Sequence, residues 1–210
     1  MPASCRLPSV GALLALLLSA SVFAAAGPGP DRGRPAESLA GQLLVAAPEL
    51  EDPNFRETVV YLVQHDRAGA MGLVINRVLG KSPLDRLLEG LGLAPETRSD
   101  LELRVHYGGP VQPTSAFVLH SPDYRGEGTL VVSDLAALTA SPAILEDIAA
   151  GRGPKRSLFA LGYAGWGPNQ LESELADGAW HVIAPDDALL FDEDAATKWQ
   201  RAYARRGVEL

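Results

Sequence analysis

Thr58-Val-Val-Tyr-Leu-Val63 and Met71-Gly-Leu-Val-Ile-Asn76 carry the clearest structural pattern in this sequence. Both are short, apolar and rich in β-branched residues, which favour β-strands. The segment between them, His65-Asp-Arg-Ala-Gly-Ala70, contains aspartate and glycine, which are common where strands are connected. The three pieces together predict a β-hairpin.

Six further segments have the length and composition of strands. They are residues 42–47, 103–107, 116–120, 128–132, 157–163 and 180–184. Four helices are expected among and after them. Two begin at Ser82 and Ser141, because each serine precedes a proline; serine is a favoured N-cap and proline a favoured first helical residue. Asp85 would complete a capping box with Ser82. The other two helices are predicted over 168–176 and 194–206.

The order of these segments predicts a single α/β (mixed α+β) domain over residues 39–210. The chain has 210 residues and 47% hydrophobic residues, which is ordinary globular composition. We find no internal repeat and no change in composition after residue 38. Nothing in the pattern suggests a second folded domain.

The N-terminus differs from the rest of the chain. In residues 1–26, Arg6 is the only charged side chain, and a long apolar run ends in Ala24-Ala25-Ala26. This pattern is typical of a secretory signal peptide and too short for a transmembrane helix. It predicts an exported or periplasmic protein, with 27–38 as a flexible linker. The alternative is a cytoplasmic protein whose residues 1–38 come from a wrongly assigned start codon.

The overall charge limits the classes of partner. The formal net charge is -8, and an acidic surface is repelled by a phosphate backbone, which argues against direct nucleic-acid binding. The single cysteine, Cys5, excludes a disulfide framework, a thiolate zinc site and an iron–sulfur cluster.

The glycine-rich segment Gly162-Tyr-Ala-Gly-Trp-Gly-Pro-Asn-Gln170 follows a predicted strand and precedes a predicted helix. Read as a loop, it could present backbone N–H groups to an anion. It lacks the Gly-Lys-Ser/Thr of a phosphate loop. The other interpretation is that its glycines permit a tight turn and close packing under Trp166.

A second backbone-driven feature is Tyr107-Gly-Gly-Pro110. Two adjacent glycines permit positive φ angles and the close approach of a ligand or of another strand. A plain turn is the simpler interpretation.

Residues with chemical potential are scattered. The four histidines, His65, His106, His120 and His181, have no zinc-binding spacing, and no G-x-S-x-G elbow accompanies a serine. The acidic clusters at 186–187 and 192–194 lack calcium-loop spacing and are better explained as helix caps. The sequence therefore predicts no catalytic residue, no metal site and no cofactor.

Five motifs, in this order along the chain, resemble those of the YqgE/AlgH family of bacterial proteins. They are GQLLVAAP (41–48), LEDPNF (50–55), GAMGLVIN (69–76), YGGP (107–110) and GYAGW (162–166), the last followed by QLE (170–172). The resemblance covers residues 39–191. It implies one compact domain with a strongly bent mixed β-sheet and helices packed around it. Members are often labelled transcriptional regulators, and most begin near the position of Glu37, so the N-terminal extension departs from the pattern.

We therefore expect a non-enzymatic binding or regulatory protein with an unidentified protein or small-molecule partner. One alternative is an anion-binding or small-ligand enzyme that uses the 162–166 loop with His106 or His181 as a base. A third is a transcriptional regulator that acts indirectly or by binding DNA. The motif residues expected to form the binding surface are Asp52, Pro53, Asn54, Phe55, Asn76, Gly108, Gly109, Pro110, Gly162, Gly165, Trp166 and Gln170.

Overall fold

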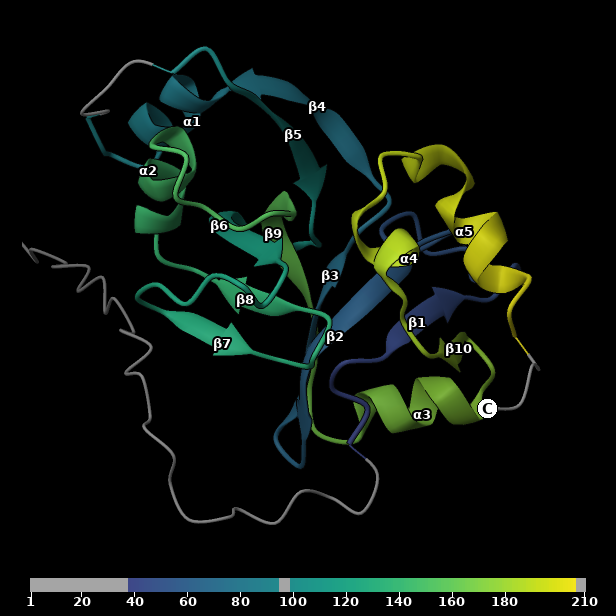
Figure 1. Ribbon diagram of the computed structural model, residues 1–210. Coiled ribbons are helices and arrows are strands. Elements are labelled where there is room, and N and C mark those ends of the chain that lie inside the picture. The colour runs from purple at the N-terminus through teal and green to yellow at the C-terminus, as the bar shows by residue number, and fades with distance from the viewer. Residues whose placement is uncertain (1–37, 95–98, 207–210) are drawn as a thin grey trace, which may run out of the picture. The chain divides into compact units, whose positions relative to one another are not determined.

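The computed structural model describes residues 38–94 and 99–206 (Figure 1). The predicted signal peptide, and the predicted linker apart from Ser38, lie outside the described residues. The strands are β1 (Leu43–Ala46), β2 (Val59–Asp66), β3 (Gly69–Val74), β4 (Val78–Pro83), β5 (Glu102–Tyr107), β6 (Val111–His120), β7 (Thr129–Val131), β8 (Ala137–Thr139), β9 (Ser157–Trp166) and β10 (Trp180–Ile183). The helices are α1 (Leu84–Gly90), α2 (Ala143–Ala149), α3 (Gln170–Ala176), α4 (Asp187–Phe191) and α5 (Ala195–Tyr203).

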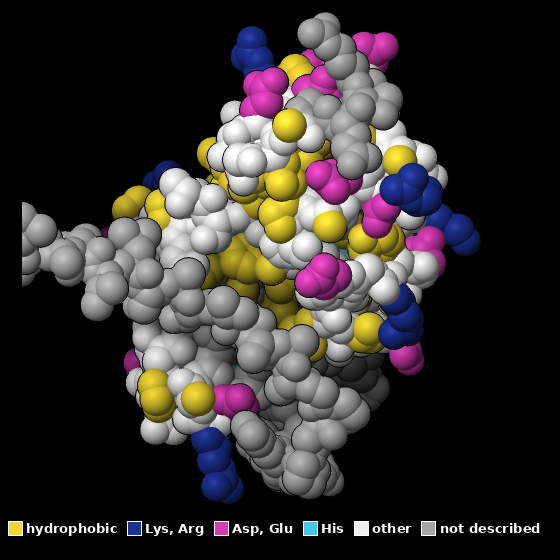
Figure 2. All heavy atoms as spheres, turned by 90° about the vertical axis from the view of Figure 1, so that its left-hand side faces the viewer, with side chains coloured by type: hydrophobic (Ala, Val, Ile, Leu, Met, Phe, Trp, Pro, Cys, Tyr) yellow, Lys and Arg dark blue, Asp and Glu magenta, His cyan; other side chains and the backbone are white. Residues whose placement is uncertain are grey.

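The strands form one ten-stranded sheet in the order β10-β1-β2-β3-β9-β6-β8-β7, with β5 beside β9 and β4 beside β5. Among the strand pairs of the described residues, the β5–β9 pair alone is parallel, so the sheet is mixed. Figure 1 shows it strongly curled, with α1 and α2 at one end and α4 and α5 at the other. Figure 2, in which the left-hand side of Figure 1 faces the viewer, shows hydrophobic side chains gathered in a hollow of that face. The predicted mixed α/β domain with a strongly bent sheet is confirmed. Of the described residues, none belongs to a helix long and apolar enough to cross the membrane.

The predicted hairpin forms as β2 and β3, which pair antiparallel from Val60–Val74 to Asp66–Gly69. Alternate residues of these strands pack on opposite faces of the sheet. Tyr61 and Leu73 belong to one buried cluster, with α4 and α5, whereas Val60 and Val74 belong to another, with α3. Because both faces are covered over residues 59–63 and 72–75, these parts of the hairpin have no polar alternation.

Strand β9 connects the two halves of the sheet. Its first part pairs with β5 and β6, and its last three residues, Ala164 to Trp166, pair with β3. Gly162, between these parts, has a φ of 71°, a value that glycine adopts without steric cost. The prediction of a loop over 162–166 was therefore wrong. These residues belong to the sheet and do not form an exposed ring of N–H groups for an anion.

Gly108 and Gly109 pack directly on this bend. The Gly108 N–H donates to Leu161 O (2.8 Å), and its carbonyl accepts from Val74 N–H (2.9 Å). A β-carbon at Gly108 would overlap the carbonyl oxygen of Gly162, and one at Gly109 would overlap the carbonyl group of Tyr163. The two glycines thus permit the close approach of another strand, β9. This was one of the two interpretations of the motif.

The helix starts are only partly as predicted. Pro83 and Pro142 are the N-caps of α1 and α2 and make no side-chain cap, so the serine caps were wrong. Ser82 instead lies in β4, where it pairs with Leu103. The acidic clusters do act as caps: Asp186 accepts from Leu189 N–H (2.8 Å) and Asp194 from Thr197 N–H (3.2 Å). Strands β4 and β8 and helix α4 were not predicted.

Candidate functional site

The connection between β1 and β2, residues 52–57, is an ordered turn. The Asp52 carboxylate accepts from Asn54 N–H (2.7 Å), and the Asp52 carbonyl accepts from the N–H groups of Phe55 (2.9 Å) and Arg56 (2.7 Å). This is the local arrangement expected of an aspartate and a proline at a turn. Asp52, Pro53 and Asn54 are exposed at its tip, whereas Phe55 is half-buried.

Two side chains after β3 hold this turn from below. The Asn76 amide oxygen accepts from Val59 N–H, and the amide nitrogen donates to Glu57 O (both 2.9 Å). The Arg77 guanidinium donates to the carbonyls of Pro53 and Arg56 (both 2.8 Å). These four bonds fix the turn at both ends.

Tyr107, at the end of β5, completes the support. Its hydroxyl donates to Asn54 Oδ1 (3.1 Å), and the Arg77 guanidinium carbon lies 5.9 Å from the centre of its ring. Burial raises the pKa of Tyr107, so the hydroxyl is a stable donor at neutral pH. We call residues 52–57 with Asn76, Arg77 and Tyr107 the 52–57 platform.

Phe55 joins the platform to an aromatic cluster. Its ring lies 6.1 Å from that of Trp166 and 5.6 Å from that of Trp180. One oxygen of Glu174 accepts from both indole N–H groups, at 2.9 and 2.8 Å. The other accepts from Gln170 Nε2 (2.9 Å).

The structure thus gathers part of the predicted residues into two adjacent groups that meet at Phe55, whereas Gly108, Gly109 and Gly162 lie together at the bend of β9. The predicted residues also differ in exposure. Asp52, Pro53, Asn54, Pro110 and Gln170 are exposed and accessible to a partner. The others are buried or half-buried in packing roles: Phe55, Asn76, Gly108, Gly109, Gly162, Gly165 and Trp166.

Two supporting residues were not predicted from the sequence: Arg77, which holds the platform, and Glu174, which holds the aromatic cluster. Arg77 directly follows a motif asparagine, and Glu174 lies in the helix after the glycine-rich motif, so both are close to motifs in sequence. Neither position has a local pattern that marks it, because their partners are 24 and 6–8 residues away along the chain.

Structural hydrogen bonds hold the side chains of His65, His106 and His120. His65 Nδ1 accepts from Leu39 N–H (3.0 Å), so the proton lies on Nε2, which donates to the Glu172 carboxylate (2.8 Å). His120 is buried between the Ser121 carbonyl (2.8 Å) and the Thr139 hydroxyl (2.9 Å). His181 packs on Tyr203 at 5.5 Å. Within residues 38–94 and 99–206, no three His, Cys, Asp or Glu side chains are grouped to hold a metal ion.

The family model described as AlgH-like matches residues 43–210. The chain belongs to the AlgH-like family. An UPF0301 protein of Caulobacter vibrioides is 47% identical over 174 residues, which cover 82% of this chain and 89% of the relative. One from Sphingopyxis alaskensis is 46% identical over 169 residues, covering 80% and 89%.

Two solved structures support the AlgH-like fold. The solution structure of AlgH from Pseudomonas aeruginosa superposes with a TM-score of 0.70 at 41% identity, covering 85% of this chain and 94% of that one. A crystal structure of a Corynebacterium diphtheriae protein has a TM-score of 0.65 at 18% identity, covering 84% and 91%, and shows the shared fold alone.

In this AlgH-like domain, His106 should make stability depend on pH. Burial lowers its pKa from 6.5 to about 4. Between these values the unfolded chain binds more protons than the folded one, so stability falls as the pH drops below 6.5. The full loss is on the order of 3 kcal/mol. Urea titration at pH 7 and at pH 4 gives the loss of unfolding free energy between the two pH values. We expect this loss to be smaller in His106→Gln than in the wild-type protein by about this amount. If the unfolding free energy depends on pH equally in the wild-type protein and in His106→Gln, then His106 is not the titrating group.

Proposed function

We propose that this protein is a non-enzymatic binding protein that recognises a protein partner through the exposed tip of the 52–57 platform. The proposal rests on one observation: the polar side chains beneath this turn form hydrogen bonds to the turn itself. Asn76, Arg77 and Tyr107 direct hydrogen bonds to the turn. A general acid or base must be free to exchange a proton with substrate, whereas these groups are fixed as supports.

A turn held in this way is suited to binding. A loop ordered before the encounter loses little conformational entropy on association, and loops placed by a rigid scaffold commonly carry recognition. The exposed side chains are Asp52, Pro53, Asn54, Arg56 and Glu57. This mixture of both charges with apolar surface suits the polar rim of a protein interface. The net charge of -8 disfavours DNA as the partner.

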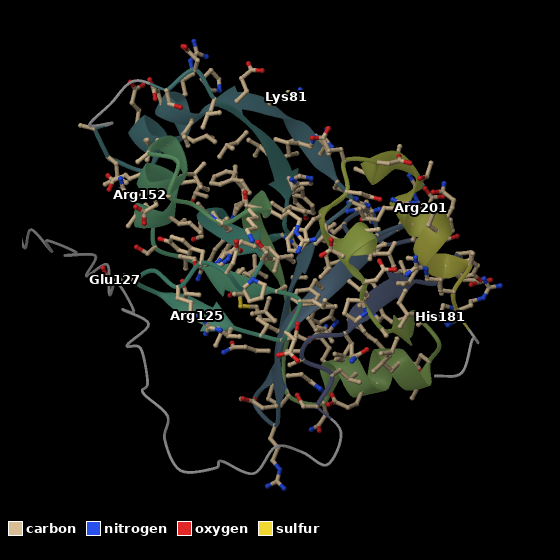
Figure 3. All side chains as sticks on the ribbon, viewed as in Figure 1. Lys81, Arg125, Glu127, Arg152, His181 and Arg201 are labelled. Atoms are coloured by element: carbon tan, nitrogen blue, oxygen red, sulfur yellow. The ribbon has the colours of Figure 1, made fainter. Side chains whose placement is uncertain are left out.

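The test is site-specific photo-crosslinking in the cells that make the protein. A photoreactive residue at Arg56 should give an adduct of discrete mass. The same residue at Glu127, an exposed position on the loop before β7 (Figure 3), should not. Arg77→Ala, which releases the turn without altering its exposed surface, should reduce the adduct several-fold.

The proposal fails if position 56 gives no adduct above that at position 127. It also fails if the adduct is unaffected by Arg77→Ala in a protein that melts as a folded domain, because recognition would then not depend on the ordered turn.

A further inference from the structure

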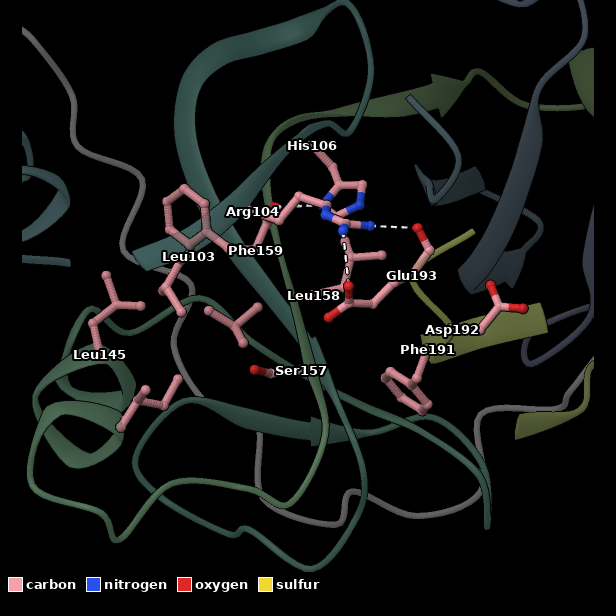
Figure 4. Close-up of a pocket in the computed structure, with 12 residues that line it drawn as sticks. Leu103, Arg104, His106, Leu145, Ser157, Leu158, Phe159, Phe191, Asp192 and Glu193 are labelled. Carbon is pink, nitrogen blue, oxygen red and sulfur yellow. Dashed lines mark hydrogen bonds and ion pairs between the residues drawn. The ribbon is translucent and has the colours of Figure 1, made fainter. Parts of the chain in front are cut away.

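A pocket of about 110 Å³ lies between the β5, β6 and β9 part of the sheet, α2 and the segment that joins α4 to α5 (Figure 4). It is separate from the 52–57 platform. Polar groups contribute more of its accessible surface than apolar ones, and the apolar lining comes from Leu103, Val118, Leu145, Ile148, Leu158, Phe159 and Phe191. Its polar lining comes from Arg104, His106, Ser157, Asp192 and Glu193. A concave site that places a charged group beside apolar side chains can hold a small ligand with a charged head and an apolar tail.

Arg104 is the positively charged residue that lines this pocket, and its ion pair with Glu193 is weak. The guanidinium donates to the Glu193 carboxylate (3.0 Å) and to the Glu193 carbonyl oxygen (Figure 4). The Arg104 side chain is 26% exposed, whereas that of Glu193 is 91% exposed. An ion pair with one partner so exposed contributes about 0–1 kcal/mol, so another carboxylate can displace it.

Asp192, the other carboxylate that lines the pocket, already has cationic neighbours. Its Oδ2 lies 2.5 Å from the Arg201 guanidinium, and its Oδ1, which is buried without a hydrogen bond among the described residues, lies 3.5 Å from the Lys198 ammonium. His106 lines the pocket, donates from Nδ1 to Phe159 O (3.2 Å) and is neutral at pH 7, because burial lowers its pKa. Among the described residues, Glu193 is the carboxylate paired with Arg104, so displacement of that side chain would leave the guanidinium free for the carboxylate of a ligand.

We propose that this pocket binds a small aliphatic carboxylate, and that the Glu193 side chain occupies the position of the ligand's carboxylate in the free protein. Nη2 of Arg104 would donate to the ligand's carboxylate as it does to that of Glu193, while Nη1 stays on the Glu193 carbonyl oxygen, and the leucine and phenylalanine side chains take the aliphatic part. The volume has space for roughly four groups of the size of a water molecule or a methylene, which selects a short chain. This site is independent of the proposed function.

Butyrate is the probe, titrated into the full chain and followed by ¹H–¹⁵N NMR. We expect saturable shifts at the amides of Arg104, His106 and Phe159. n-Butanol and butylamine, which keep the chain but lack the carboxylate, should bind at least about tenfold more weakly, since a charge-assisted bond is lost. Arg104→Ala should weaken butyrate binding by at least the same factor.

Glu193→Gln is the discriminating variant. It removes the competing carboxylate from an exposed side chain, so the fold is retained and butyrate should bind more tightly than to the wild-type protein. Shifts that do not saturate, equal binding of butanol, or unchanged affinity in Glu193→Gln would each overturn the proposal.

Discussion

Replacing Gly108 by alanine is expected to lower the free energy of unfolding by about 4 kcal/mol or more, a loss reached only by severe steric or core defects. The added methyl would overlap the Gly162 carbonyl and lie 3.2 Å from the Ala160 side chain. Since both neighbours belong to β9, which pairs with β3, β5 and β6, relief requires the two halves of the sheet to separate.

Urea unfolding of purified protein measures this loss, and the yield of soluble protein reports it if folding fails. Gly90→Ala is the matched control, because a β-carbon there meets open space at the end of α1. It should be neutral or slightly stabilising, by at most about 1 kcal/mol. A Gly108→Ala protein as stable as the Gly90→Ala control would show that the contact between the glycines and β9 is not close.

Replacing Glu174 by alanine is expected to cost roughly 3 kcal/mol, because two indole N–H donors in a buried cluster lose their acceptor. Trp166 and Trp180 are 6% and 3% exposed, so water cannot fully replace the carboxylate. The packing of Phe55 on both rings should loosen as well, and with it the base of the 52–57 platform. Urea unfolding followed by tryptophan fluorescence measures both effects.

Glu174→Gln is the control for this prediction. Its amide oxygen can still accept from both indoles, as one carboxylate oxygen does in the wild-type protein, so the loss should be only about 1 kcal/mol. If the alanine and glutamine variants are equally stable, the shared oxygen does not hold the tryptophans.

The strands were predictable because their signal is local. Runs such as 58–63 and 71–76 are apolar on both faces, and the covered sheet requires that pattern. Asp186 and Asp194 were also recognisable as caps, since an N-cap acts within three residues. Strand β4 was missed because five of its six residues are exposed, which leaves no hydrophobic pattern to read.

Contacts between segments that are distant along the chain could not be predicted from the sequence. The glycines at 108–109 and 162 were each recognised as sites of close approach, but only the structure shows that they approach each other. The 162–166 segment was taken for a loop because glycines usually mark turns, whereas here they permit a bent strand. The pocket around Arg104 draws on β5, α2 and the α4–α5 junction, and nothing along the chain indicated that these meet. The alternation of Arg104 and His106 on one face of β5 was the one available signal.

Recognition through the 52–57 platform requires this turn to be ordered before any partner arrives, and amide hydrogen exchange of the free protein tests this most directly. The N–H groups of Asn54, Phe55, Arg56 and Thr58 are all hydrogen-bonded within the turn. They should exchange well below the rate of an unstructured peptide in the wild-type protein, and lose much of that protection in Arg77→Ala. Exchange of these four amides at the unstructured rate in the wild-type protein would mean that the platform is not preformed, and the binding proposal would lose its basis.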